Sequence, residues 1–267
     1  MMVNSTNTPI ALTVAGSDSG GGAGIQADLK TFHQFGVFGT SAVTAVTAQN
    51  TTGVHTIHEI PLEVVLAQID AVVSDLRPAA FKTGMLATNA ITVGVANAVR
   101  KHQLRGYVMD PVMVATSGDR LLAPDAENAM RTHLLPLATI VTPNMDEASL
   151  LTGRPVGTPA EMGDAARALV DQGAGAALVT GGHLDTEVID IFWNGTVEHR
   201  WPRPRIETRH THGTGCTLSA VITARLACGD GVADAVDAAV GFIHRAIGSA
   251  PGLGSGHGPV NHFAPTD

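Results

Sequence analysis

The chain has 267 residues, of which 44% are hydrophobic, 4% aromatic and 15% charged, and 30 of them are glycine. A chain this apolar is not intrinsically disordered, its glycines follow no triplet repeat, and no stretch reaches the roughly 20 uninterrupted apolar residues of a membrane helix. The formal net charge of −8 argues against a general affinity for nucleic acid or anionic membranes, although a local site can still bind a small anion.

Apolar periodicity predicts alternating strands and helices along the whole chain. The predicted strands are 10–15, 40–48, 54–60, 79–83, 106–110, 138–142, 176–180, 187–193 and 196–201. The predicted helices begin at residue 25 and continue with 62–75, 88–101, 124–134, 146–152, 159–172, 214–228 and 232–248. Asn194-Gly195 is typical of a type I′ hairpin turn.

Short connections between alternating strands and helices predict one α/β domain with a mainly parallel sheet and helices on both faces. No linker divides the chain, so we expect a short N-terminal tail over 1–9 and a single domain over 10–267. In such folds ligands bind at the carboxyl ends of the strands, where many of the glycines and carboxylates of this sequence are predicted to lie.

The two cysteines, Cys216 and Cys228, are predicted to lie on one helix, about 18 Å apart along its axis. A disulfide needs Cα atoms within about 7 Å, so they should not pair. Without a disulfide framework or an N-terminal segment of the secretory type, the sequence favours a reducing cytoplasm.

Two glycine-rich segments precede predicted helices. The first, 16–24, has neither the Walker spacing nor the dinucleotide fingerprint, so it is either a ligand-contacting loop or a plain turn. Asp28, one turn into the next helix, faces either the site or solvent. In the second, 213–216, free N–H groups and the helix dipole favour an anion. The same field favours a thiolate at Cys216; the alternative is an ordinary buried cysteine.

Two carboxylates follow neighbouring strands of the predicted sheet. Asp110 ends the strand at 106–110, and Glu147 lies just beyond Pro143-Asn144. Their oxygens suit Mg²⁺, and Asn144 could orient a water or a phosphate. Taken singly, each carboxylate is more often a helix cap or a solvated group, but their shared location favours a functional site.

Histidines and arginines give weaker signals. The 12 histidines show no zinc-like spacing, so we expect no metal site built from them. Four arginines, at 200, 203, 205 and 209, are interrupted by Pro202 and Pro204 and are expected to form a solvated connector.

Seven segments occur in order along residues 10–262. They are 15–30 (AGSDSGGGAGIQADLK), 47–51 (TAQNT), 82–86 (KTGML), 110–113 (DPVM), 142–148 (TPNMDEA), 211–217 (THGTGCT) and 256–262 (GHGPVNH). Together they resemble the hydroxymethylpyrimidine/phosphomethylpyrimidine kinases of thiamine biosynthesis, within the ribokinase-like superfamily. The resemblance implies a ribokinase-like three-layer α/β sandwich, with a mainly parallel central sheet, helices on both faces and a small β flap.

The resemblance also implies an activity and its residues. The activity is ATP-dependent phosphorylation of 4-amino-5-hydroxymethyl-2-methylpyrimidine, then of its monophosphate, by a cytoplasmic homodimer. The residues that would bind the pyrimidine are Gly16, Asp28, Gln49, Met85 and Val112, with Gln49 reading its polar edge. The anion hole would consist of Gly213, Thr214, Gly215 and Cys216, with Cys216 as the base. Asp110 and Glu147 would hold Mg²⁺, ATP phosphates would meet Asn144, Thr180 and Gly182, and 114–120 would form a mobile lid.

One residue departs from the family pattern. Thr180 stands before two glycines, where the family commonly has a lysine, so the hydrogen-bond donor is kept but the charge is lost. Two alternatives stay open: a pyridoxal or pyridoxine kinase on the same fold, and a catalytically silent pyrimidine-binding protein. The complete set of Asp110, Glu147 and Cys216 argues against the silent protein.

Overall fold

The computed structural model describes residues 8–113, 124–182 and 187–267. The lid expected at 114–120 lies outside these ranges. The described strands form one sheet in the order β3-β2-β1-β4-β5-β6-β7-β8-β9. Their bounds are β1 Ile10–Asp18, β2 Phe38–Asn50, β3 Gly53–Glu59, β4 Ala80–Thr83, β5 Tyr107–Met109, β6 Ile140–Val141, β7 Ala177–Val179, β8 Glu187–Trp193 and β9 Glu198–Pro204. The six central strands of this order pair in parallel; they are β2, β1, β4, β5, β6 and β7. At the two edges, β3 joins β2 antiparallel, and β8 and β9 join β7 and each other antiparallel.

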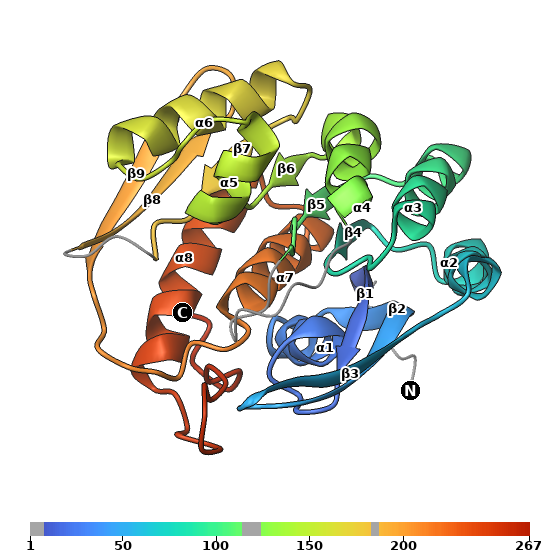
Figure 1. The fold of residues 1–267 in the computed structure, drawn as a ribbon, viewed down its shortest axis with the longest axis horizontal. Helices are drawn as coiled ribbons and strands as arrows, with labels where there is room; N and C mark the ends of the chain where they lie inside the picture. The colour runs from blue at the N-terminus through green and yellow to red at the C-terminus, as the bar shows by residue number, and fades with distance from the viewer. Residues whose placement is uncertain (1–7, 114–123, 183–186) are drawn as a thin grey trace, which may run out of the picture.

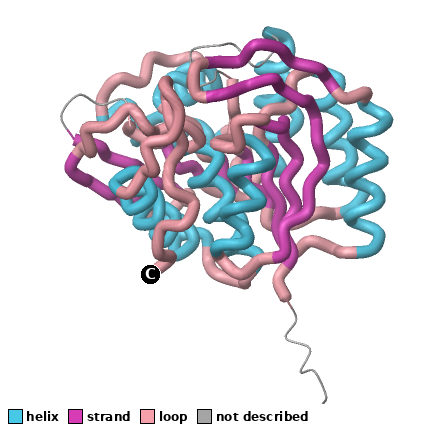
Figure 2. The backbone as a smooth tube through the Cα atoms, turned by 90° about the horizontal axis from the view of Figure 1, so that it is seen from below, coloured by secondary structure: helices cyan, strands magenta, loops and turns pink. Residues whose placement is uncertain are grey.

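Helices cover both faces of the sheet (Figure 1, Figure 2). Their bounds are α1 Gly24–Gln34, α2 Leu62–Asp75, α3 Asn89–His102, α4 Pro124–Ala129, α5 Met145–Thr152, α6 Pro159–Asp171, α7 Thr214–Ala227 and α8 Val232–Gly248. Side chains of α2, α3, α5 and α6 pack on one face, and those of α1, α7 and α8 on the other. The expectation of a three-layer α/β fold with a mainly parallel sheet is confirmed. No helix within the described residues has the length and apolar character needed to cross a membrane.

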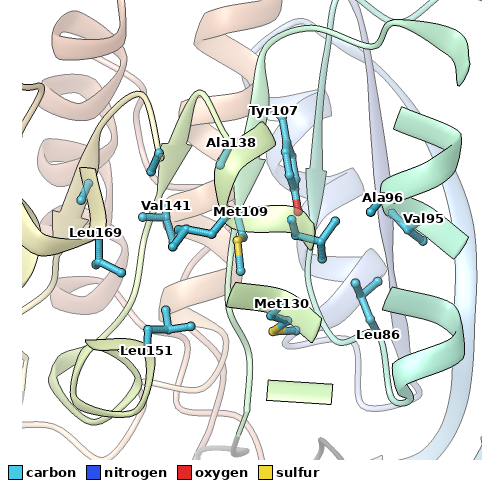
Figure 3. Close-up of a cluster of buried hydrophobic side chains, with 14 of the residues drawn as sticks. Leu86, Val95, Ala96, Tyr107, Met109, Met130, Ala138, Val141, Leu151 and Leu169 are labelled. Atoms are coloured by element: carbon cyan, nitrogen blue, oxygen red, sulfur yellow. The ribbon is translucent and has the colours of Figure 1, made fainter. Parts of the chain in front are cut away.

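The core beneath α3, α5 and α6 joins small aliphatic side chains to a few larger ones (Figure 3). Tyr107 of β5 stacks on Phe81 of β4 with ring centroids 4.5 Å apart, and its hydroxyl hydrogen-bonds the Thr83 hydroxyl at 2.7 Å. Successive residues of a strand point to opposite faces, so Phe81 and Thr83 face this core while Lys82 faces α7. Every residue of β4 is buried, so Lys82 is a charge inside the protein.

Polar caps set the start of several helices. Thr88, Asn144 and Thr158 each accept a hydrogen bond from a backbone N–H in the first turn of α3, α5 and α6. At Asn144 the cap is reciprocal, because the Glu147 carboxylate accepts the Asn144 N–H at 2.9 Å. Asn144 and Glu147 therefore serve as a capping box, whatever else they bind.

Two local predictions are wrong. Asn194-Gly195 does not form a two-residue type I′ turn, because only Gly195 has positive φ; the Asn194 side chain instead accepts from the backbone of Thr196 and Val197, and β9 starts at Glu198. The helix expected at 124–134 ends as α4 at residue 129 and continues as a π-turn, Met130–Leu134, before the 3₁₀ turn Leu135–Leu137. Pro136 lacks the N–H that an α-helix needs.

The arginine-rich segment is not a solvated connector. It forms much of β9, an edge strand that tolerates Pro202 and Pro204 because ladder hydrogen bonds are needed on one side only. Arg203 pairs with the buried carboxylate of Asp190 on β8 and donates to the Val240 carbonyl at 2.9 Å.

Candidate active site

Four of the five residues expected to bind the pyrimidine lie at the carboxyl ends of β1, β2, β4 and β5. Met85 packs with Val112 in a small apolar cluster. A Cβ at Gly16 would come within 2.5 Å of the Met85 methyl, so a side chain at this position would displace Met85. Gln49 is held through its backbone N–H, which donates to the Ser19 hydroxyl at 2.8 Å, and its side chain keeps an amide donor for a ligand. The four residues lie at one end of the sheet, as expected.

Gly213 lies directly before α7 and has a conformation open only to glycine. Its φ is +80°, and an added Cβ would come 1.8 Å from the Gly22 carbonyl oxygen. The N–H of Thr217 donates to the Gly213 carbonyl at 2.9 Å. By contrast, a Cβ at Gly215 would meet nothing within 4 Å, and the N–H groups of Gly215 and Cys216 meet no acceptor among the described residues. The first turn of α7 thus offers two free donors at the positive end of a helix dipole.

Cys216 is not the thiolate that its helix position suggested. Burial raises the pKa of its thiol to about 12, with Lys82 opposing that shift and the carboxylates of Asp110 and Asp28 adding to it. The N–H of Gly24 donates to the sulfur and favours the thiolate, but too weakly to prevail. In the ligand-free protein this direction contradicts the expectation of a low-pKa thiolate, because burial and the two carboxylates outweigh Lys82 and the Gly24 N–H. Both Cys216 and Cys228 are free of disulfides, as predicted.

Lys82 was missed by the sequence analysis. Its ammonium is fully buried, 2.8 Å from Asp28 Oδ1 and 3.5 Å from Asp110 Oδ2, and it donates to the Cys216 carbonyl at 3.5 Å. Burial alone would lower the pKa of Lys82, but the carboxylates of Asp28 and Asp110 outweigh it and raise the pKa, so Lys82 is a cation. The available signal was a lysine inside an otherwise apolar strand, which requires buried partners.

Asp28 reaches this group from α1. Its side chain is fully buried, accepting from the Thr13 hydroxyl at 2.6 Å as well as from Lys82. Its carboxylate lies behind Lys82 instead of lining an open pocket.

Asp110 and Glu147 form a pair of buried carboxylates. Asp110 accepts from the Ser219 hydroxyl of α7 at 2.9 Å. Burial raises the pKa of Glu147 to about 8, and the negative charge of Asp110 adds to the shift. Within the described ranges no group of three His, Cys, Asp or Glu side chains could hold a metal on its own. The hard oxygens of two neighbouring carboxyl groups nevertheless fit Mg²⁺, which keeps several of its waters.

The segment expected to meet ATP phosphates follows β7. Thr180 forms a bridge with Asn144 and donates its N–H to the Pro143 carbonyl at 2.9 Å, so the two residues are neighbours. The next N–H, of Gly181, donates to the buried Asp190 carboxylate at 3.0 Å, and Gly182 accepts from Arg205 at 3.1 Å. Asp190 lies on β8 and Arg205 directly after β9, so no pattern around Thr180 predicts these contacts.

In the first glycine loop, the backbone N–H groups surround a carboxylate of the chain itself, that of Asp18. The Asp18 carboxylate accepts from the N–H groups of Gly20, Gly22 and Ala23 at 2.8 to 3.0 Å, and it meets His212 Nε2 at 2.9 Å. Burial tends to raise the pKa of Asp18, but the hydrogen bonds from His212, Ala23 and Gly20 together lower it. Asp18 and His212 are 194 positions apart, so only the fold reveals that they join the two glycine loops.

Comparisons with known proteins agree with this arrangement. A family profile described as phosphomethylpyrimidine kinase matches residues 18–261. A hydroxymethylpyrimidine/phosphomethylpyrimidine kinase of Rhizobium meliloti is 54% identical over 260 residues, covering 96% of this chain and 97% of that protein. The chain belongs to the phosphomethylpyrimidine kinase family.

Solved structures place the phosphomethylpyrimidine kinase family beside the pyridoxal kinases. The ADP complex of Bacillus subtilis pyridoxal kinase superposes with a TM-score of 0.90 at 39% identity, covering 96% of this chain and 98% of that one. A phosphomethylpyrimidine kinase of Clostridium difficile gives a TM-score of 0.81 at 39% identity, covering 89% of this chain and 99% of that one. This phosphomethylpyrimidine kinase family member thus shares its architecture with enzymes named for either substrate.

Proposed function

We propose that this protein transfers the γ-phosphoryl group of ATP to the hydroxymethyl oxygen of 4-amino-5-hydroxymethyl-2-methylpyrimidine, and then phosphorylates the monophosphate. The observation that carries the proposal is the placement of Cys216, in the first turn of α7, against the buried Lys82 and Asp110. Free N–H groups, a sulfur and a pair of carboxylates thus meet where the strands end. The names of the similar kinases supply the substrate class.

In this proposal the pyrimidine lies at Gly16, Met85 and Val112, with Gln49 hydrogen-bonded to its polar edge. The pyrimidine offers ring nitrogens and an amino group, and a carboxamide both donates and accepts, so Gln49 can match such an edge. The β2–β3 hairpin, which carries Gln49 near its tip, acts as the small β flap.

The transferred phosphoryl group is proposed to lie at the N–H groups of Gly215 and Cys216. Fixed donors aimed at a developing negative charge are a major source of catalysis in phosphoryl transfer. Before Cys216 can accept the hydroxyl proton it must lose its own, and Lys82 and the Gly24 N–H are the described groups that favour this. Neutralising Asp110 by ligand binding would remove a charge that opposes it.

Asp110 and Glu147 are the residues proposed to hold Mg²⁺. When bound, the ion neutralises charge on the phosphates of ATP. Asn144, Thr180 and Gly182 are proposed to contact those phosphates, with Thr180 offering a hydroxyl where a lysine is common. ATP as the donor agrees with the ADP complex of the similar pyridoxal kinase.

The protein is further proposed to be a single catalytic domain over 10–267 that works as a cytoplasmic homodimer. The continuous sheet from β3 to β9 supports one domain, and the two unpaired cysteines suit a reducing compartment. The dimer rests on the family resemblance, and sedimentation velocity tests it.

Product analysis by mass spectrometry tests the activity. With the pyrimidine, ATP and Mg²⁺, we expect products carrying one and then two added phosphoryl groups. The second candidate function is phosphorylation of pyridoxal, favoured by the match to pyridoxal kinase. Measuring ADP release with each compound separates the two, and a strong preference for pyridoxal would overturn the first choice.

A further inference from the structure

Lys82 is a buried cation whose contacts extend beyond its electrostatic effect on the Cys216 thiol. It lies on β4 with no exposed surface and meets three different elements: Asp28 of α1, Asp110 after β5 and the Cys216 carbonyl of α7. Its Asp28 partner is fixed in turn by the Thr13 hydroxyl of β1. One ammonium therefore ties α1 and α7 to the carboxyl ends of the central strands.

The contacts of Ser219 close this arrangement into a network. The Ser219 hydroxyl lies 2.9 Å from Asp110 Oδ2 and 3.0 Å from the carbonyl oxygens of Gly215 and Cys216. Asp110 and the first turn of α7 are thus joined twice, once through Ser219 and once through Lys82. Lys82 supplies the only formal positive charge among these contacts, which makes its bonds to carboxylates the stronger ones.

Stability alone gives a poor reason for this lysine. Removing a charge pair from water costs much of what the pair gains, and well-packed apolar side chains often stabilise as well or better. What an apolar side chain cannot do is hold Asp110 and the Cys216 carbonyl at set positions. Two of the three Lys82 contacts, Asp110 and the Cys216 carbonyl, belong to the proposed phosphoryl site, so the geometry of the network favours a positional role.

We propose that Lys82 is a positioning residue that keeps the Asp110 carboxylate in register with the first turn of α7 during phosphoryl transfer. This rests on the proposed function, because Asp110 and Gly215–Cys216 are its phosphate-handling groups. Lys82 does not touch substrate. It acts by holding the two sides of the phosphoryl site at a fixed separation, on which transfer rates depend steeply.

The main test is Lys82→Met, which keeps most of the length of the side chain and removes its charge. We expect kcat to fall at least 30-fold while KM for ATP and for the pyrimidine each change less than threefold. A purely structural role predicts instead that the folded fraction of the variant turns over at the wild-type rate. A kcat within threefold of wild type, corrected for folded fraction, overturns the proposal.

The double variant Asp28→Asn/Lys82→Met separates position from stability. It removes both charges of the Lys82–Asp28 pair. We therefore expect the double variant to regain most of the decrease in melting temperature seen in Lys82→Met, while its kcat stays at least 30-fold below that of the wild type. Recovery of kcat together with the melting temperature contradicts the proposal. If the single variant does not fold, the double variant carries the same test. If neither folds, Thr13→Val, which only loosens Asp28, must lower kcat at least threefold, and an unchanged kcat overturns the proposal.

Tyr107→Phe is the matched control. It removes a buried hydrogen bond on the opposite face of the same strand, where Tyr107 meets Thr83. We expect a lower melting temperature with kcat unchanged within twofold. All variants are assayed on whichever compound the wild type phosphorylates. A wild type that accepts only pyridoxal therefore refutes the proposed substrate and leaves the Lys82 test intact.

Discussion

The two glycine-rich loops look alike in sequence and differ in what their N–H groups meet. In the first, the Asp18 carboxylate already accepts three backbone N–H groups of the loop. In the second, the N–H groups of Gly215 and Cys216 meet no acceptor within the described part of the chain. The N–H groups of the first loop are therefore already satisfied by a carboxylate of the chain, whereas two N–H groups of the second loop are available to a ligand.

The difference teaches that glycine content alone does not locate an anion site. Glycines permit a backbone to turn its N–H groups inward, but a nearby carboxylate of the chain can satisfy them. The first loop is also in contact with the second. Asp18 meets His212, and the Gly22 carbonyl packs against Gly213. The first loop thereby shapes the second.

Cys216→Ala tests the second loop and has the largest expected effect. Removing a general base lowers turnover by about 10²–10⁴-fold, while pyrimidine binding, measured by calorimetry, largely survives. Cys228→Ala is the control, because this exposed cysteine lies at the far end of the same helix. Unchanged turnover in Cys216→Ala would remove Cys216 from its proposed role.

Glu147→Gln sharpens the contrast between Asp18, where hydrogen-bond donors outweigh burial and lower the pKa, and Glu147, where burial outweighs the donors and raises it. The pKa of Glu147 is raised to about 8, so between about pH 4.3 and 8 the folded protein binds a proton that the unfolded chain has lost. Stability from this group therefore falls as pH rises through that window. We expect the variant to be more stable than wild type at pH 8, by on the order of a few kcal/mol, and nearly equal at pH 4. Urea unfolding in EDTA measures this, and an equal stability at both pH values contradicts it.

Gly213→Ala breaks the contact between the two loops. A positive φ and a Cβ only 1.8 Å from the Gly22 carbonyl oxygen force the backbone to move, at a cost of about 3 kcal/mol in unfolding free energy. The matched change, Gly215→Ala, places a methyl in open space and should leave the unfolding free energy unchanged within about 0.5 kcal/mol. Denaturant melts that rank the two variants equally would show that the loops are not in contact.

Asp18→Asn tests the first loop and has the smallest expected effect. An amide oxygen accepts fewer hydrogen bonds and carries no charge, so we expect a loss of about 2 kcal/mol at pH 7. The pKa of Asp18 is lowered on folding, so its stabilisation is present above about pH 3.9 and is lost as pH falls through the folded pKa. The difference between wild type and variant should thus shrink in acid. A constant difference from pH 7 to pH 2 would mean that the carboxylate charge does not matter.

Much of the fold was predictable because strands and helices leave periodic apolar patterns. The helix expected at 62–75 has those bounds, and α8 was predicted at 232–248 as found. Predictions were wrong where a side chain's environment depends on a tertiary partner. Arg203 of β9, for example, pairs with Asp190 of the neighbouring strand β8. At a candidate site, sequence can name carboxylates and glycines but not which of them are already satisfied.

Lys82 and Cys216 illustrate the properties of the site that could not be predicted from the sequence. Lys82 meets Asp28 across 54 positions, and no local spacing marks that pairing. The pKa of Cys216 likewise depends on burial and on Asp110, Asp28 and Lys82, so the helix position alone predicted it in the wrong direction. Such properties belong to the packed site.

The most direct test of the account is amide NMR of the ¹⁵N-labelled protein titrated with the pyrimidine monophosphate, Mg²⁺ and a non-hydrolysable ATP analogue. We expect the amide resonances of Gly215 and Cys216 to move to saturation, while those of Gly20 and Gly22, already bonded to Asp18, stay within their line widths. Large shifts at Gly20 and Gly22 with none at Gly215 and Cys216 would contradict it.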